Sequence, residues 1–210
     1  MIQFINFQKQ YGDYKVIDIA ATQIENGIYW IKGINGSGKS TLLRCLAGLI
    51  PFEGTININN INIHKYKRLH RQMVNYGEAE PAYPDFLTGS ELIHFYVSTK
   101  GGNKVQCMQY AEQLQLHNAL QKQTGSYSSG MLKKLSLVLA FTGNPKWILL
   151  DEPLITLDTD AVQVILYLIE QAYNRGISFL LTSHQDVAFS NHHLPLQTLH
   201  LQNKTITALP

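Results

Sequence analysis

The sequence predicts an α/β protein with a mostly parallel core sheet, an N-terminal antiparallel β region and an inserted helical segment. Short apolar runs bounded by glycine, proline or charge are typical of strands buried on both faces of a sheet. Three such runs occur, at Ile28–Ile31, Trp147–Leu150 and Ile177–Leu181. Longer segments of helical periodicity separate them, including residues 161–172, which follow Asp158 as a candidate N-cap. This alternation of strand and helix favours a parallel sheet.

One region has the pattern of an antiparallel edge. Thr55–Ile58 alternates polar and apolar side chains, and the alternation resumes at Ile61 and Ile63. Asn59 and Asn60, which separate the two segments, readily adopt the left-handed conformation that a tight turn needs. We therefore expect an antiparallel β region that joins the parallel core.

The stretch from about Gly89 to Thr124 has helical periodicity only. Its apolar positions form two groups, one around Leu92 and the other around Met108. No repeat, low-complexity segment or Pro/Gly/Ser-rich linker divides the chain. We therefore expect one domain over residues 1–210, with a core of residues 1–88 and 125–210 and a helical subdomain inserted over about residues 89–124.

Composition excludes several classes of protein. The formal net charge is +2, and Lys and Arg are scattered, so no nucleic acid partner is expected. No signal peptide is evident, and no apolar run approaches the ~20 residues of a membrane helix. Cys45 and Cys107 lack metal-ligand spacing and are expected to be buried thiols in a reducing compartment. We therefore expect a cytoplasmic chain whose membrane role, if it has one, comes through a partner.

Residues Gly33–Thr41 fit the phosphate-binding loop pattern, in which a glycine and four further residues precede Gly-Lys-Ser. The loop follows the apolar run Ile28–Ile31 and precedes the helical segment Leu42–Leu49, which is the context that the motif needs. Glycines let backbone N–H groups curve around an anion, and the positive end of the helix dipole stabilises phosphates. The predicted nucleotide-binding residues of this loop are Gly33, Asn35, Gly36, Ser37, Gly38, Lys39, Ser40 and Thr41.

A second acidic motif completes the predicted site. The apolar run Trp147–Leu150 ends in Asp151 and Glu152. A buried strand delivers Asp151 to the sheet edge beside the phosphate loop, where it and Ser40 are expected to hold Mg²⁺. Glu152, one residue further on, can orient or polarise the attacking water. Lys39 is expected to contact the β- and γ-phosphates.

Together these residues resemble those of an ABC ATPase, and the resemblance covers essentially the whole chain. Tyr127–Met131 is similar to the signature motif of that family, since it precedes a helical segment and lies shortly before Asp151. In the family this segment reaches across a dimer to the γ-phosphate held by the other subunit. The resemblance implies that Ser128, Ser129 and Gly130 act in this way, through a hydroxyl and backbone N–H groups at a helix N-terminus.

Three further residues receive roles from the same resemblance. Thr156–Asp158 resembles the aspartate loop, which places Asp158 at the dimer seam. His184 is similar to the switch histidine and is expected to donate a hydrogen bond to the γ-phosphate. Tyr11 resembles the aromatic residue on which adenine stacks, with an ordinary edge-strand tyrosine as the alternative. The implied catalytic residues are Glu152, His184 and Lys39.

Two departures from the family pattern stand out. The signature usually has two adjacent glycines, and Ser129 replaces the first; a serine keeps the backbone donor, so the contact is expected to survive. The glutamine loop of the family should lie near Tyr76–Pro81, which contains no glutamine. Either Glu78 or Glu80 acts instead, or the function of this loop is weakened. The stretch Tyr83–Glu91 resembles the one in bacterial drug, antibiotic and haem exporter ATPases.

The resemblance implies an ATP-binding and ATP-hydrolysing subunit of an ABC transporter, in particular of an exporter. The implied cofactors are ATP and Mg²⁺. The implied partners are an integral-membrane permease on a separate chain and a second ABC ATPase subunit, either identical or different. ATP would close the cassette dimer and hydrolysis would release it. The implied location is the inner face of the cell membrane, where the chain is peripherally bound.

The main alternative is a non-transport ABC ATPase that acts on nucleic acid or the ribosome. Chromosome-type members carry a very long coiled coil between phosphate loop and signature, and translation-type members usually hold two cassettes; this chain shows neither. A P-loop GTPase or nucleotide kinase is a different class, but Asn103-Lys104 and Asn203-Lys204 are not followed by the aspartate of the guanine-reading motif. Four further histidines show no metal-ligand spacing and are expected to be surface or core residues: His64, His70, His192 and His193.

Overall fold

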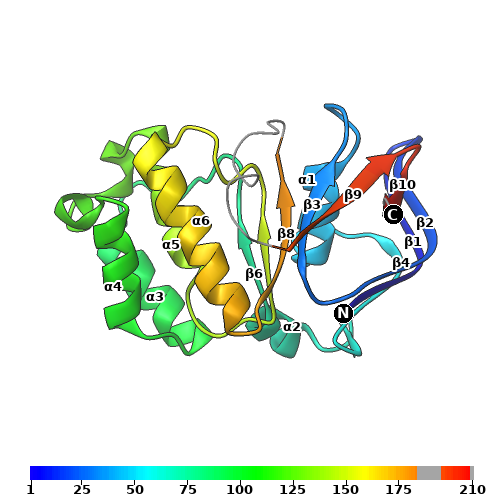
Figure 1. The fold of residues 1–210 in the computed structure, drawn as a ribbon, viewed down its shortest axis with the longest axis horizontal. Coiled ribbons are helices and arrows are strands. Elements are labelled where there is room, and N and C mark those ends of the chain that lie inside the picture. The colour runs from blue at the N-terminus through cyan, green and yellow to red at the C-terminus, as the bar shows by residue number, and fades with distance from the viewer. Residues whose placement is uncertain (184–194, 209–210) are drawn as a thin grey trace.

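The computed structural model describes residues 1–183 and 195–208, and its centre is a six-stranded sheet with the order β10-β9-β3-β8-β7-β6 (Figure 1). Neighbouring strands from β9 to β6 are parallel, and β10 pairs with β9 in the antiparallel sense. The strands span Ile28–Lys32 (β3), Val74–Gly77 (β6), Trp147–Leu150 (β7), Ser178–Thr182 (β8), Leu196–Gln202 (β9) and Thr205–Ala208 (β10). The predicted mostly parallel core sheet is confirmed.

Both faces of the core sheet are covered, which explains the continuous apolar runs. On β7, Ile148 and Leu150 pack into the apolar cluster on the helical side. Trp147 and Leu149 of the same strand pack into a second cluster on the opposite face. Successive side chains of a strand point to opposite faces, so a strand covered on both sides is apolar at every position.

A second sheet is antiparallel and four-stranded, with the order β2-β1-β4-β5, and it lies at one end of the molecule (Figure 1). Its strands span Ile2–Tyr11 (β1), Tyr14–Ile24 (β2), Glu53–Ile58 (β4) and Ile61–Asn62 (β5). Asn59 and Asn60 form the turn between β4 and β5 with φ angles of 48° and 64°, as predicted. The two sheets are joined through Asp18 of β2, whose N–H donates to the carbonyl of Lys204 at 2.7 Å.

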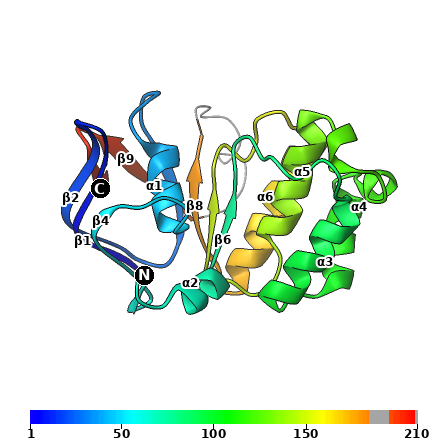
Figure 2. The same ribbon diagram turned by 180° about the vertical axis from the view of Figure 1, so that it is seen from behind.

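Helices cover the core sheet on both sides. In the described residues they span Lys39–Leu46 (α1), Lys67–Met73 (α2), Gly89–Lys100 (α3), Lys104–Gln113 (α4), Ser129–Ala140 (α5) and Thr159–Asn174 (α6), with short 3-10 turns at His117–Ala119 and Thr124–Ser126. Helix α1 lies between the two sheets, and α3 to α6 gather on the opposite face (Figures 1 and 2). The predicted helical stretch therefore contains α3 and α4; that it forms a separate subdomain stays a prediction.

Two sequence expectations about the surface and interior can be compared with this fold. Cys45 in α1 and Cys107 in α4 are both buried free thiols, as predicted. No helix in the part of the chain that the structure describes is long and apolar enough to cross a membrane.

Candidate nucleotide-binding site

The phosphate loop joins the end of β3 to the start of α1, as the sequence predicts. Gly36 and Gly38 have φ angles of 77° and 103°, a region that favours glycine. At Gly38 a side chain is also excluded by space, because a Cβ there would lie 2.7 Å from Val16 of β2. Packing of the antiparallel sheet therefore helps to fix the point at which α1 begins.

Lys39, the first residue of α1, folds back onto the loop. Its Nζ donates to the carbonyl oxygens of Gly33 at 2.7 Å and Ile34 at 3.2 Å. The residue is only 6% exposed, and burial lowers its pKa, an effect that nearby carboxylates oppose. The Ser37 hydroxyl is buried and has no hydrogen-bond partner within the described residues. A cation and an unsatisfied buried hydroxyl in a glycine-rich loop fit a bound phosphate.

The carboxylate of Asp151, just after β7, accepts hydrogen bonds from three hydroxyl groups on three elements. Ser40 of α1 and Thr182 of β8 donate to Oδ1, at 3.0 Å and 2.7 Å. Tyr76 of β6 donates to Oδ2 at 3.2 Å. Strands β6, β7 and β8 are parallel neighbours, so their C-terminal ends meet at one sheet edge. The structure thus brings the two predicted metal ligands together and adds Tyr76, to which sequence reasoning gave no role here.

The donor set at this edge fits Mg²⁺ that arrives with a nucleotide. Ser40 and Asp151 offer a hydroxyl and a carboxylate oxygen beside the ammonium of Lys39. Mg²⁺ commonly binds through one or two carboxylates together with substrate phosphates rather than in an all-protein cage. The described ranges contain no cluster of three or more His, Cys, Asp or Glu side chains suited to hold a metal.

Glu152 follows directly and has a strained backbone. Its φ is 47°, in the left-handed region, which costs a non-glycine residue about 1 kcal/mol or more. The residue is 7% exposed, and its N–H donates to Thr182 Oγ1 at 2.9 Å. Because the same Thr182 hydroxyl donates to Asp151, it fixes the two acidic residues relative to each other.

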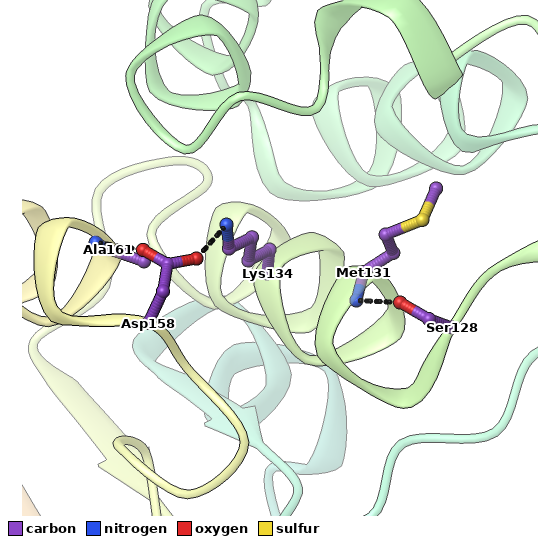
Figure 3. Close-up of polar contacts among 5 residues, drawn as sticks. All are labelled: Ser128, Met131, Lys134, Asp158 and Ala161. Carbon is purple, nitrogen blue, oxygen red and sulfur yellow. Dashed lines mark hydrogen bonds and ion pairs between the residues drawn. The ribbon is translucent and has the colours of Figure 1, made fainter.

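The predicted signature segment begins α5 (Figure 3). Ser128 is the N-cap, and its Oγ accepts the N–H of Met131 at 3.2 Å. Ser128 and Ser129 are exposed at the positive end of the helix dipole, an arrangement that suits an anion presented from outside the chain. At Gly130 a Cβ would lie 3.1 Å from the carbonyl oxygen of Thr156, so position 130 has little room for a side chain.

Asp158 caps α6 and also contacts α5 (Figure 3). Its Oδ1 accepts the N–H of Ala161 at 2.8 Å, so it is the N-cap that the sequence predicts. Its Oδ2 pairs with Lys134 Nζ at 2.7 Å. The hydrogen bond from Lys134, followed by that from Ala161, holds the pKa of Asp158 below its usual value. Both oxygens have partners within the chain, and a role at a dimer seam stays a prediction.

Lys133 is a site residue that sequence reasoning missed. Its Nζ donates to the carbonyl oxygens of Glu78, Ala79 and Asp151, at 2.6, 3.2 and 2.8 Å. The residue is 1% exposed, and burial lowers its pKa to about 8, an effect that neighbouring carboxylates oppose. No sequence signal marks it, because a lysine on a helix is usually exposed and its carbonyl partners come from distant segments.

The remaining predicted residues are less closely tied to this arrangement. Tyr11 is 51% exposed at the end of β1, with Lys9 Nζ 4.6 Å from its ring centroid, and its stacking on adenine stays a prediction. Glu78 is half-buried and Glu80 is exposed. His184 lies outside the described residues, as do His192 and His193.

The loop between a buried strand and a helix, with a lysine and a serine in the first turn and an aspartate at the neighbouring strand end, defines a P-loop nucleoside triphosphatase. A family model described as ABC transporter matches residues 18–155. The chain therefore belongs to the ABC transporter family, as an ATP-binding cassette.

Individual relatives and structures agree with this assignment. The uncharacterized ABC transporter ATP-binding protein YxlF of Bacillus subtilis (strain 168) is 31% identical over 198 residues, which cover 91% of this chain and 62% of the relative. The Nod factor export ATP-binding protein I of Burkholderia orbicola (strain AU 1054) is 31% identical over 190 residues, 87% of this chain and 62% of the relative. This chain thus spans less than two thirds of the length of both relatives. A solved dimeric bacterial ABC transporter cassette has the same fold, with a TM-score of 0.84 at 20% identity over 100% of this chain and 99% of that chain.

Proposed function

We propose that this chain hydrolyses Mg-ATP as the motor subunit of an ABC exporter, in a cassette dimer that acts on a permease carried by a separate polypeptide. The proposal rests on the contact between the residue pair Lys39–Ser40, at the end of the phosphate loop, and Asp151, at the end of strand β7. Ser40 Oγ lies 3.0 Å from Asp151 Oδ1, and Lys39 and Glu152 flank this pair in sequence.

Each residue has a chemical task in this mechanism. Lys39 exchanges its carbonyl partners for the β- and γ-phosphates. Ser40 and Asp151 would hold Mg²⁺, which when bound neutralises charge on the phosphate oxygens. Glu152 orients the attacking water and accepts its proton. His184 donates a hydrogen bond to the γ-phosphate, a role inferred from the family resemblance.

A second cassette completes each site. The exposed Ser128–Gly130 segment offers a hydroxyl and N–H groups to the γ-phosphate held by its neighbour. A ligand shifts an equilibrium only by its different affinity for the two states. Contacts made across the dimer supply that difference, so ATP favours the closed dimer and hydrolysis favours the open one. The similar fold of a dimeric cassette supports this arrangement.

Replacement of Glu152 by glutamine tests the mechanism. Glu152→Gln keeps the size and the backbone contact with Thr182 but removes the base. We expect ATP binding within about threefold of the parent, turnover reduced by about a hundredfold or more, and an ATP-dependent dimer on size-exclusion chromatography. Lys39→Ala serves as the contrast, since it should weaken binding itself. Equal turnover in parent and Glu152→Gln would remove Glu152 from its role.

Transport, and export in particular, is supported by the resemblance of Tyr83–Glu91 to exporter ATPases and by the Nod factor export relative. The test is to identify what co-purifies with the tagged chain from detergent-solubilised membranes. We expect a multi-span integral protein and a location at the inner membrane face. Ribosomes or a defined nucleic acid, retained at high salt and without such a protein, would favour the non-transport alternative.

A further inference from the structure

The segment Tyr76–Ala79 lies between a large cavity and the catalytic strand end. The cavity, of about 950 Å³, is lined by residues of α2, β6 and α3, by the loop that follows α1 and by the end of α5, and Tyr76 and Glu78 belong to its wall. Tyr76 also donates to the carboxylate of Asp151 at 3.2 Å. The segment therefore lines the cavity through Tyr76 and Glu78, and it contacts the candidate nucleotide site through the Tyr76 hydroxyl.

Lys133 reaches this segment from helix α5. Its ammonium group donates to the carbonyls of Glu78, Ala79 and Asp151 at 2.6, 3.2 and 2.8 Å. An ammonium has three N–H donors, and these three carbonyls satisfy all of them. The partners come from the loop after β6 and from the end of β7, and the donor comes from the helix that begins with Ser129.

We propose that Lys133 is a positioning residue for ATP hydrolysis, which holds the Glu78–Ala79 loop and the Asp151–Glu152 strand end as one unit. The proposal rests on the ATPase function proposed above. Lys133 touches neither carboxylate directly in these contacts; it acts through the backbone of Asp151. A displacement of the loop at the cavity wall would thereby displace the residues that hold the metal and orient water.

The physical reason lies in the burial of the ammonium. If the loop moved alone, Lys133 would lose two of its three partners while it stayed 1% exposed. A buried charged donor without partners is far more unfavourable than an exposed one, because the charge has no water to replace the lost acceptors. Movement of the loop together with α5 and the strand end avoids this state.

Steady-state kinetics on three variants test the proposal. Lys133→Met keeps the length of the side chain and removes every donor, and Lys133→Gln keeps two donors on a shorter chain. Lys146→Met, at an exposed lysine before β7, is the matched control. We expect Lys133→Met to lower kcat about tenfold or more, as loss of supporting contacts around a metal site does. KM for Mg-ATP should stay within about threefold, because the phosphate loop is untouched.

Further outcomes separate positioning from a structural role. We expect partial recovery of kcat in Lys133→Gln and parent-like rates in Lys146→Met. Parent-like kcat in a folded Lys133→Met, or equal losses in the Met and Gln variants, would overturn the proposal. Absence of turnover in the parent would instead contradict the ATPase function and say nothing about Lys133.

A spin label gives a readout that does not need turnover, and it also covers the case in which Lys133→Met fails to fold. Glu80 is exposed, and burial raises the pKa of both native thiols, Cys45 and Cys107, so a label attaches selectively to Glu80→Cys. We expect Mg²⁺ with a non-hydrolysable ATP analogue to change the mobility of this label in the parent. The response should be smaller in Lys133→Gln than in the parent, with unchanged analogue affinity. An identical response in both proteins would overturn the proposal.

Discussion

Two adjacent residues of the signature segment differ in the space around them. Ser129 is exposed at the start of α5. Gly130 approaches the carbonyl of Thr156, which would lie 3.1 Å from a Cβ. Thr156 itself has a φ of 66°, in the left-handed region. We therefore expect a side chain to be tolerated at position 129, whereas at position 130 a side chain would have to displace the Thr156 carbonyl.

We expect Gly130→Ala to lower ATP turnover and to change the free energy of unfolding only slightly. Alanine gains about 1 kcal/mol of helix propensity over glycine, which offsets the strain of moving the Thr156 loop, so the free energy of unfolding should change by less than about 1 kcal/mol. We expect ATP turnover to fall about tenfold, because the segment that we propose to meet the other cassette is displaced. Urea denaturation and steady-state ATPase assays measure the two quantities.

Ser129→Ala is the comparison for that experiment. Its effect on turnover should be several times smaller, since the backbone N–H remains and no neighbour has to move. If both variants reduced turnover equally, the contact with Thr156 would not explain the requirement for glycine.

At the scale of elements, the middle of α5 is tied to the N-terminus of α6. Lys134 of α5 pairs with Asp158, which also caps α6 through Ala161. The Lys134 side chain is 12% exposed and that of Asp158 is 56% exposed, so the ion pair alone is partly screened and contributes modestly. The ion pair acts mainly on geometry, since it sets how α5 lies beside the loop that precedes α6.

Substitutions at Asp158 should separate the cap from the ion pair. Asp158→Asn keeps an oxygen that can cap α6 and loses the charge, so we expect a loss of unfolding free energy below about 1 kcal/mol. Asp158→Ala loses the cap as well and should cost about 1–2 kcal/mol. Lys134→Met should match Asp158→Asn in chemical denaturation. Equal effects of the Asn and Ala variants would show that the cap contributes nothing.

At the scale of the whole molecule, a buried histidine makes stability depend on pH. His70 of α2 is 4% exposed, and its Nε2 donates to the carbonyl of Leu46 at the end of α1 at 2.8 Å. Burial lowers the pKa of His70 below its ordinary 6.5, and the positive charges of Lys100 and Arg71 add to this, while the hydrogen bond to Leu46 opposes it. The fold therefore prefers the neutral ring.

The sign of the pH effect follows from linkage. Because the unfolded chain binds the proton more readily, the stabilisation is fully present above about pH 6.5 and is lost as pH falls through the folded pKa. We expect the free energy of unfolding to fall as the pH is lowered below about 6.5. His70→Gln, which keeps a donor for Leu46, should flatten this part of the curve. An unchanged slope in this variant would assign the effect to other groups.

The sequence was sufficient for those parts of the fold that local pattern determines. The run Trp147–Leu150 is β7 as predicted, because its residues are buried on both faces. The run Ile177–Leu181 is shifted to Ser178–Thr182, since the N–H of Ile177 still bonds to Ala172 and closes the end of α6. Strand β6 was not predicted, because its buried Asn75 is satisfied only by the distant carbonyls of Ala140 and Thr142.

The candidate site likewise contains residues that the sequence alone located and residues that only the structure reveals. The phosphate loop and the Asp151–Glu152 pair are contiguous motifs with a recognisable context, so sequence alone located them. Tyr76, Thr182 and Lys133 contact Asp151 only after parallel strands and α5 have come together. Such contacts join residues up to 75 positions apart and leave no local pattern. The sequence therefore identifies the residues predicted to bind and hydrolyse ATP more readily than the residues that position them.

The wall of the large cavity has a practical consequence for purification. The described residues that line this wall include one carboxylate, Glu78, and four basic residues from α2 and the end of α3, namely Lys67, Arg68, Arg71 and Lys100. Such a concentration of cations attracts polyanions at low ionic strength and releases them as counterions screen the charge. Oligonucleotides carried over from a lysate in dilute buffer are therefore an expected contaminant of the isolated chain. We expect such carry-over to appear as absorbance at 260 nm that a salt wash removes.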